Sequence, residues 1–232
     1  MIEMKHIGIV ACSAEGAALC YRTICTEAPE LLGKYAHPEV TMHTFSFAEY
    51  MKHIEAEDWK AVADLMLASA KKVAGAGADF AICPDNTIHQ AFGLFIDKSP
   101  IPWLHIAEVA AEEAVRHNYR RLGILGTRFI MEGPVYREKL DAAGIGHMIP
   151  GENDRERINS IIFDELVAGI FTDEARAYFV GVIAELKGRG CDAVVLGCTE
   201  IPIIVTPESS PLPPLDSTRL LARAALKKAI ES

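Results

Sequence analysis

The sequence predicts an α/β protein with two pseudosymmetric halves, each a mostly parallel sheet flanked by helices in a Rossmann-like or flavodoxin-like arrangement. Short apolar runs alternate with segments of helical spacing, which is typical of parallel strands joined by crossover helices. The same order of elements begins again near residue 121. Two similar halves are therefore the simplest interpretation of a chain of 232 residues.

The first half contains four expected strands, at residues 6–12, 40–46, 79–83 and 101–106. A small-residue loop after residue 12 leads into a helix through residues 19–24, and further helices are expected at 59–74 and 107–117. Gly75 and Gly77 end the helix that begins at Trp59. Each strand is thus followed by a loop and a helix, as in a βαβ series.

The second half repeats this order with expected strands at 121–127, 146–150 and 191–196 and helices at 136–143, 158–169 and 173–187. Residues 151–157 are polar and are predicted to form a loop, and five prolines between 202 and 214 indicate a connection. A last helix is expected at 217–230. We expect residues 1–105 plus 208–232 to form the first α/β half and residues 106–207 the second.

The two halves align as an internal repeat. An offset of 113 places Gly77 to Thr87 over Gly190 to Glu200 without a gap, so that Asp85 falls on Cys198. An offset of 115 places the first strand over the strand that begins at Arg121. Halves related by an approximate twofold would bring the ends of matching strands together across a cleft, with Asp85 and Cys198 facing one ligand.

Cys198 follows a strand whose continuous apolar run is typical of burial on both faces of a parallel sheet. Ligands of such sheets bind at the carboxyl ends of the strands, where Cys198 would stand. A helix starting at Thr199 or just after would direct its positive end at the thiol and favour the thiolate. The competing interpretation is a small buried residue that fills a tight turn.

Composition excludes several other classes of protein. A net charge of −9 without a basic cluster argues against nucleic acid as a partner. Six cysteines show no C-x-x-C pair and no metal-ligand spacing, which fits a reducing, cytoplasmic compartment. The chain enters its first strand directly, so no signal peptide is expected, and no apolar run approaches the ~20 residues of a membrane span.

Five motifs run in the same order as in a known family, over nearly the whole chain: residues 86–89 (NTIH), 126–131 (GTRFIM), 162–169 (IFDELVAG), 197–202 (GCTEIP) and 214–219 (PLDSTR). In these the chain resembles the cofactor-independent aspartate/glutamate racemases of the Asp/Glu/hydantoin racemase superfamily. The resemblance implies two α/β halves with the active site between them. It further implies α-proton removal on one face and return on the other, with neither pyridoxal phosphate nor metal, usually in a homodimer.

The chain departs from that family at one catalytic position. The family usually has cysteine before Asn-Thr in the first half, where this chain has Asp85, so the resemblance carries over a catalytic thiol only at Cys198. Three roles are open for Asp85: a base if burial makes it basic enough, a binding group for the substrate's amino group, or a turn residue after Pro84. Cys83 lies two residues earlier and points elsewhere around the proline turn.

The predicted substrate-binding residues are polar side chains at turns, namely Ser13, Asn86, Thr87, Thr127, Thr199 and Glu200. Hydroxyls and amides there would stabilise the charge that develops on the α-carboxylate, although each alone could be a plain helix cap. Glu200, like His89, could orient a catalytic group or bind an ammonium group. Arg128 could pair with a second carboxylate or form a structural ion pair. Around residues 40–53 the cationic candidates are His43, Lys52 and His53.

The predicted function is racemisation of aspartate, glutamate or a related small amino acid, with Cys198 and Asp85 as the two catalytic residues. If Asp85 cannot serve as a base, Cys198 would be the sole proton donor of a single-thiol lyase, decarboxylase or isomerase. A third interpretation is an amino-acid-binding homologue that has lost a base. We expect neither a cofactor nor a metal.

Overall fold

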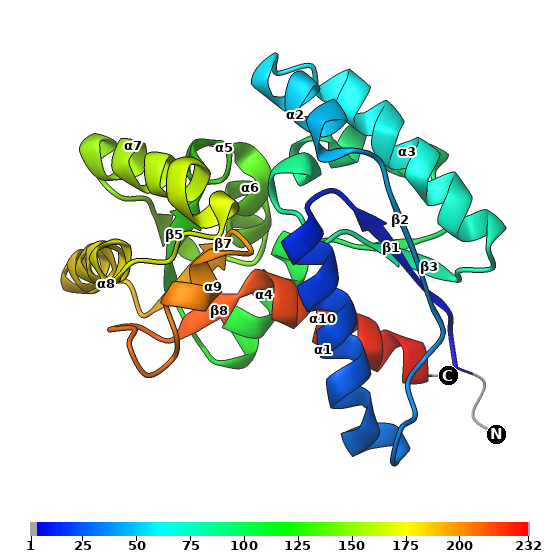
Figure 1. Ribbon diagram of the computed structural model, residues 1–232. Helices are drawn as coiled ribbons and strands as arrows, with labels where there is room; N and C mark the ends of the chain where they lie inside the picture. The colour runs from blue at the N-terminus through cyan, green and yellow to red at the C-terminus, as the bar shows by residue number, and fades with distance from the viewer. Residues whose placement is uncertain (1–3, 232) are drawn as a thin grey trace. The chain divides into compact units, whose positions relative to one another are not determined.

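The computed structural model describes residues 4–231 and divides into two compact units (Figure 1). Unit 1 comprises residues 1–106 and 218–232, and unit 2 comprises residues 107–217. Each unit holds one parallel four-stranded sheet, in the order β2-β1-β3-β4 in unit 1 and β6-β5-β7-β8 in unit 2. The predicted fold class of two similar parallel α/β halves is therefore confirmed.

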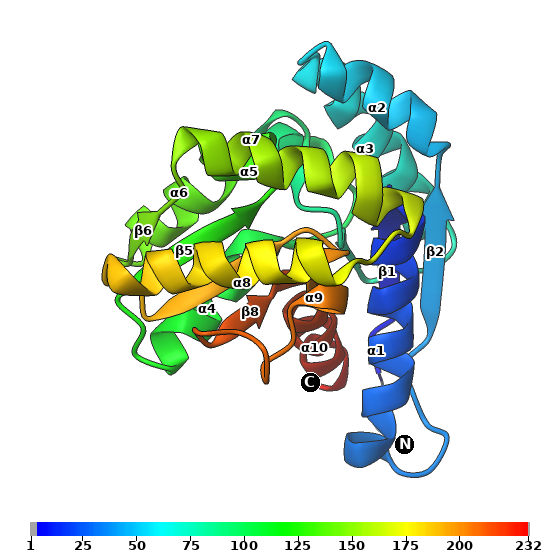
Figure 2. The same cartoon turned by 60° about the vertical axis from the view of Figure 1, so that its left-hand side comes forward.

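Unit 1 is built from β1 (Ile7–Ala11), α1 (Ala14–Leu32), β2 (Val40–Thr44), α2 (Phe47–Glu55), α3 (Trp59–Gly75), β3 (Phe80–Ile82), the 3₁₀ helices η1 (Thr87–Leu94) and η2 (Ile96–Lys98), β4 (Trp103–Leu104) and α10 (Ser217–Ile230). All five residues of β1 are buried, because helices cover both faces of the sheet. The N-terminal α1 and the C-terminal α10 lie side by side (Figures 1 and 2), joined by an ion pair in which Arg223 Nε lies 2.7 Å from Glu27.

Unit 2 is built from α4 (Ile106–Arg116), β5 (Arg121–Gly126), α5 (Arg128–Glu132), α6 (Pro134–Ala142), β6 (Gly146–Met148), α7 (Glu152–Ser160), the π-helix η3 (Ile161–Glu165), the 3₁₀ helix η4 (Leu166–Ala168), α8 (Asp173–Gly188), β7 (Ala193–Gly197), α9 (Ile201–Ile204) and β8 (Pro214–Asp216). Its core joins residues of β5, α7, η3, α8, β7 and α9. Cys198 packs against this core.

The strand registers follow the internal repeat. Ile7 pairs with Phe80 in unit 1, and Leu122 pairs with Ala193 in unit 2, as the offsets of 115 and 113 predict (7 + 115 = 122; 80 + 113 = 193). In both units an aspartate holds the start of the first strand. Asp79 accepts from the backbone N–H of His6, and Asp192 accepts from that of Arg121. The repeat therefore extends to individual hydrogen bonds.

Glycines inside the two central strands also correspond. A Cβ atom at Gly8 would lie 2.9 Å from Val73 of α3, and a Cβ atom at Gly123 would lie 2.8 Å from Leu186 of α8. Both glycines let a helix approach the sheet closely. Since 73 + 113 = 186, the packing helices of the two units obey the same offset as the strands.

Several expected boundaries differ from the structure. Residues 152–157, predicted as a loop, belong to α7, whose buried Ile158 anchors a polar helix to the core. The segment 208–217, which the sequence places with the first half, contributes β8 to the second sheet through its pairing with β7. Because β8 has only three residues and begins at Pro214, it resembles the proline-rich connection around it. The described helices include none that is long and apolar enough to cross a membrane.

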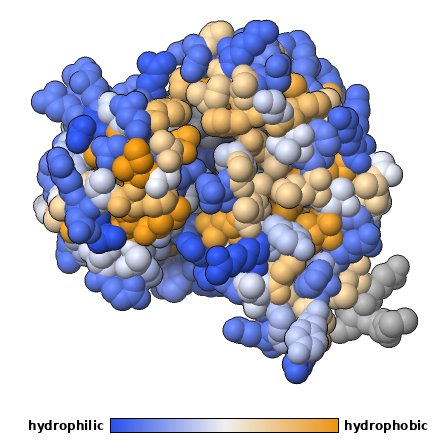
Figure 3. Space-filling view, viewed as in Figure 1, coloured by the Kyte–Doolittle hydropathy of each residue, from blue (hydrophilic) through white to orange (hydrophobic). Residues whose placement is uncertain are grey.

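Figure 3 shows apolar residues in tan and orange over much of the upper and central part of the face in view, with hydrophilic residues in blue mostly toward its edges. Exposed large apolar side chains in unit 2 include Val167, Ile170, Phe171 and Ile203. Three of these follow the π-helix directly.

Candidate active site

In unit 1, the candidate residues lie at the carboxyl ends of two neighbouring strands. The chain leaves β1 through Cys12 and Ser13 into α1, and it leaves β3 through Cys83 and Pro84 to Asp85. Because β1 and β3 pair in parallel, both turns lie at the same edge of the sheet. The side chain of Ser13 caps α1 by accepting from the backbone N–H of Gly16 at 3.3 Å.

Backbone amides of the first turn hold the carboxylate of Asp85. The N–H of Cys12 donates to Oδ2 at 3.1 Å, and the N–H of Ser13 lies 3.1 Å from both Oδ1 and Oδ2. Hydrogen bonds to an ionised group stabilise it by about 1.5–3 kcal/mol each. These amides stand at the positive end of α1, which favours an anion further. The local contacts therefore stabilise Asp85 as a carboxylate.

Asn86, Thr87 and His89 continue from Asp85 into η1. Asn86 is buried and makes no side-chain cap to this 3₁₀ helix. His89 is buried as well; its Nδ1 lies 2.8 Å from the backbone oxygen of Asp85, and its Nε2 accepts from the N–H of Ile106 at 3.5 Å. Nδ1 must then carry the imidazole proton. His89 thus fixes the turn at Asp85, which is the orienting role considered from the sequence.

Two further cysteines flank Asp85. Burial, followed by the nearby Asp85 carboxylate, raises the pKa of Cys12 well above its usual range. Burial and Asp85 likewise raise the pKa of Cys83, whose thiol donates to the backbone oxygen of Asp85 at 3.9 Å. Both groups are therefore neutral thiols at physiological pH. Cys83 does not take the place of the cysteine that the family has at position 85.

Sequence reasoning did not identify Tyr50. Its side chain on α2 is fully buried, and its hydroxyl has no hydrogen-bond partner within residues 4–231. Burial raises the pKa of Tyr50 most, and the nearby Cys83, Cys12 and Asp85 raise it further. A tyrosine on a helical segment gives no sequence signal for this placement.

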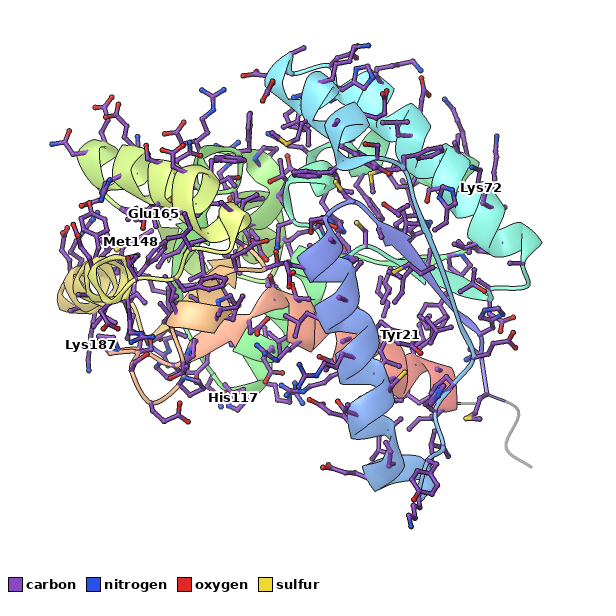
Figure 4. All side chains as sticks on the ribbon, in the orientation of Figure 1. Tyr21, Lys72, His117, Met148, Glu165 and Lys187 are labelled. Atoms are coloured by element: carbon purple, nitrogen blue, oxygen red, sulfur yellow. The ribbon has the colours of Figure 1, made fainter. Side chains whose placement is uncertain are left out.

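The cationic candidate His43 is engaged within the fold of unit 1. Its Nδ1 lies 2.7 Å from Ser69 Oγ, and Lys72 Nζ lies 3.0 Å from its Nε2. Figure 4 shows Lys72 projecting from α3. Burial, followed by the positive charge of Lys72, lowers the pKa of His43. His43 is thus a neutral link between β2 and α3, which argues against a role as a carboxylate-binding cation.

In unit 2, β7 delivers Cys198 to the edge of the second sheet through Gly197. A Cβ atom at Gly197 would lie 2.9 Å from both the backbone oxygen of Leu125 and a methyl group of Ile130. Any larger residue would push β7 away from β5 and α5. The glycine before Cys198 is therefore a requirement of close backbone packing.

The thiol of Cys198 donates to Glu200 Oε2 at 2.9 Å. Glu200 is 6% exposed, and Thr199 between them is also buried. The helix that was expected from Thr199 begins at Ile201 and has only four residues. Pro202 at its start and extended backbone at Val205 limit it to one turn, so its dipole contributes little to Cys198. The thiol is instead hydrogen-bonded to a carboxylate.

Thr127 and Arg128 occupy the turn that corresponds to Cys12 and Ser13. Thr127 is buried before α5 and makes no side-chain cap to it. The backbone N–H of Arg128 donates to Asn159 Oδ1 of α7 at 3.0 Å. In unit 2 an asparagine from another helix therefore takes the place that Asp85 has in unit 1. The exposed guanidinium of Arg128 stacks on Phe129, 4.7 Å from the ring centre.

Each unit thus gathers its own share of the predicted residues: Ser13, Asp85, Asn86 and Thr87 in unit 1, and Thr127, Cys198, Thr199 and Glu200 in unit 2. The described part of the chain contains no group of three or more His, Cys, Asp or Glu side chains that could hold a metal ion.

The chain is similar to racemases in sequence and structure. The family model Asp/Glu/Hydantoin racemase matches residues 7–225. The broad-specificity amino-acid racemase RacX of Bacillus subtilis is 24% identical over 161 residues, which cover 68% of this chain and 67% of that protein. A solved Asp/Glu racemase candidate from Yersinia pestis has a TM-score of 0.92 and 30% identity, covering 98% of this chain and all of that one.

An aspartate racemase homologue from Pyrococcus horikoshii gives a TM-score of 0.86 at 26% identity, again over 98% of this chain and all of the other. Since the family model spans nearly the whole sequence, the chain belongs to the Asp/Glu/hydantoin racemase family.

Proposed function

We propose that this protein is a racemase of a small amino acid that uses neither pyridoxal phosphate nor metal, with Cys198 and Asp85 acting on opposite faces of the substrate. Membership of the racemase family supports the reaction class. The 2.9 Å hydrogen bond from the Cys198 thiol to Glu200 is the observation that supports Cys198 as the residue that transfers the proton. A thiol with a carboxylate as proton acceptor is a pair that can gain and lose a proton.

Glu200 takes the proton of Cys198, and the resulting thiolate removes the α-proton of the substrate. The electron pair of the broken C–H bond stays on the substrate as a carbanion delocalised into its carboxylate. A protonated Asp85 then returns a proton to the opposite face and becomes a carboxylate. In the reverse direction Asp85 removes the α-proton and the Cys198 thiol supplies one.

Stabilisation of the carbanion falls to neutral donors at the strand ends, because no cofactor delocalises its charge. We assign this task to the polar groups of Ser13, Asn86, Thr87, Thr127 and Thr199. Donors that point at the place where charge develops are worth most in a site from which water is excluded. Asn86 and Thr127 support this assignment because both are buried polar residues in the turns that follow β3 and β5.

The hydrogen bonds that Asp85 accepts favour a second candidate function. The amides of Cys12 and Ser13 stabilise its carboxylate, which makes protonation of Asp85 harder and weakens it as a base. An enzyme with one effective base at Cys198 would exchange the α-proton without inverting the centre, or would protonate a carbanion produced by decarboxylation. A single-thiol lyase or isomerase is therefore the alternative.

The substrate is proposed to be aspartate, glutamate or a related amino acid. His43 is engaged by Ser69 and Lys72, so that side chain does not favour a substrate with a second carboxylate. Neutral amino acids belong in the substrate panel for that reason. We also propose a homodimer in the cytoplasm, and sedimentation equilibrium of the purified protein tests the dimer.

Incubation in D₂O with single enantiomers tests the function. Deuterium at the α-carbon together with growth of the opposite enantiomer is the result expected of a racemase. Deuterium without inversion would identify the one-base alternative. Binding of an amino acid with no exchange in any member of the panel would contradict both and leave an amino-acid-binding protein.

A further inference from the structure

A cavity of about 180 Å³ lies in unit 2 between β5, β6 and the junction of α5 and α6. Its apolar lining consists of Ile124, Met131, Met148 and Ile149. Ile124 and Met131 are buried, while Met148, which Figure 4 labels, and Ile149 are partly buried and pack against the core. Since an apolar cavity of about 150 Å³ holds benzene, this one has room for a ring with one small substituent.

The cavity is separate from the residues of unit 2 to which the reaction is assigned. In the sheet order β6-β5-β7-β8, Thr127 and Cys198 follow the neighbouring strands β5 and β7, whereas the cavity lies where β5 neighbours β6. The described residues that line it include none of those proposed to bind or convert the substrate. A ligand in this cavity is therefore distinct from a substrate held at Cys198.

The charged groups of the lining leave one positive charge uncompensated. Glu132 is already paired, because Arg155 Nε lies 2.7 Å from its Oε1. His147 also faces an acid, with its Nδ1 3.6 Å from Asp141 Oδ1. The guanidinium of Arg137, in contrast, has no ion-pair or hydrogen-bond partner within residues 4–231. A guanidinium binds a carboxylate through two parallel N–H···O bonds, so Arg137 is suited to an anionic ligand.

The start of α6 adds to this preference for an anion. Gly133 lines the cavity and is the N-cap of α6, a helix of nine residues, and it offers no side chain to the first N–H groups of that helix. The positive end of the helix dipole therefore lies at the cavity. A negatively charged group is favoured there both by this helix end and by Arg137.

We propose that this cavity binds a small monocarboxylic acid with an aromatic or branched aliphatic body. Its carboxylate pairs with Arg137, and its body fills the space beside Met131 and Met148. Because Arg155 engages Glu132, the described lining residues offer no unpaired acid for an ammonium group, so the ligand carries no α-amino group. A ligand of about nine non-hydrogen atoms binds such a site with a Kd on the order of 1 mM. This inference goes beyond the proposed racemisation and does not depend on turnover.

Benzoate is the probe for this site, and the NMR signals of methionine methyl groups report its binding. In protein labelled at its seven methionine methyl groups, we expect benzoate to shift the signals of Met131 and Met148 in a saturable manner. Met131→Leu and Met148→Leu assign the two signals. Benzamide has nearly the same shape without the charge, and we expect it to bind about three- to tenfold more weakly than benzoate. Sodium chloride controls for ionic strength.

Arg137→Gln should weaken benzoate binding about three- to tenfold and leave benzamide binding unchanged, because only the charge pair is lost. Lys187→Gln removes an exposed cation in the last turn of α8 and is the matched control, which should leave both affinities as they are. Equal affinities for benzoate and benzamide, undiminished benzoate binding in Arg137→Gln, or no saturable shift at any benzoate concentration up to about 50 mM would overturn the proposal. Because no measurement here involves an amino-acid substrate, failure of the cavity site and failure of the racemase assignment are distinguishable.

Discussion

Cys198 donates a hydrogen bond from its thiol to Glu200, a carboxylate that is itself almost completely buried. The two residues are separated only by Thr199 and stand where β7 ends. A thiol in this position can pass its proton to a neighbour without waiting for water. Glu200 is therefore expected to act through Cys198 and not on the substrate itself.

Glu200→Gln should lower kcat on the order of 100-fold while KM changes little, because the amide can accept the thiol hydrogen bond but cannot take the proton. Steady-state kinetics with the substrate found in the exchange assay measures both constants. Glu208→Gln, which changes an exposed carboxylate of the same unit, is the matched control and should leave kcat unaltered. A Glu200→Gln enzyme with native kcat would remove Glu200 from the proton path.

Asp85→Cys should shift the balance between exchange and inversion. Because the amides of Cys12 and Ser13 hydrogen-bond to the carboxylate of Asp85, we expect them to oppose its protonation and a proton removed by Cys198 to return often to the same face. A thiol at position 85 would restore a second group that is readily protonated. NMR and chiral chromatography in D₂O should show a ratio of inversion to total exchange that is severalfold higher in Asp85→Cys. An unchanged ratio would show that Asp85 does not limit inversion.

The stability of unit 1 should fall below about pH 6.5 because of His43. Burial, followed by Lys72, lowers its pKa in the folded chain from the usual 6.5. As the pH falls through 6.5, His43 is protonated more readily in the unfolded chain than in the folded chain, so the folded state loses stability. Above this pH range His43 is neutral in both states and does not affect stability. Urea unfolding between pH 5 and 8 should show this slope.

His43→Gln should reduce that slope, since glutamine can accept from Lys72 without titrating. His37→Gln is the control, because it removes an imidazole of the same unit whose Nδ1 lies 2.9 Å from the neighbouring Pro38 oxygen. The opposite outcome, a steeper slope in His43→Gln, would mean that His43 is stabilised in its charged form.

Gly197→Ala should destabilise unit 2 by about 1–3 kcal/mol, because its Cβ atom would overlap Leu125 and Ile130. Gly181→Ala is a matched substitution in the middle of α8, where nothing lies within 4 Å of the added atom. The higher helix propensity of alanine should stabilise that variant by about 0.5–1 kcal/mol. Denaturant unfolding compares the two, and equal effects would refute the packing account of Gly197.

Periodicity and the internal repeat predicted most of the fold. The central strands β1 and β5, the long helices α3 and α8 and the final helix α10 lie where apolar spacing placed them. The elements that apolar spacing did not predict have weak sequence signals. The helices α2 and α5 are short, α7 is mostly polar, and β8 is a three-residue edge strand in a proline-rich segment. Their formation depends on tertiary packing, which local propensity does not report.

The site could be predicted only in part, because a repeat aligns positions and not side-chain partners. The sequence placed Asp85 and Cys198 at equivalent strand ends, and the structure gives them different local environments: backbone amides around Asp85 and a carboxylate beside Cys198. The contacts of Asn159 and Tyr50 arise between elements distant in the chain. No spacing rule identifies such residues.

The most direct test of the account is α-deuterium incorporation in D₂O by Cys198→Ala, measured beside Cys25→Ala. Cys25 is a partly buried cysteine of α1 outside the proposed site, so its variant controls for the loss of a thiol. We predict that Cys198→Ala loses exchange by at least on the order of 100-fold, while Cys25→Ala retains it. Native exchange in Cys198→Ala would contradict the assignment of Cys198 as the group that removes and returns the α-proton.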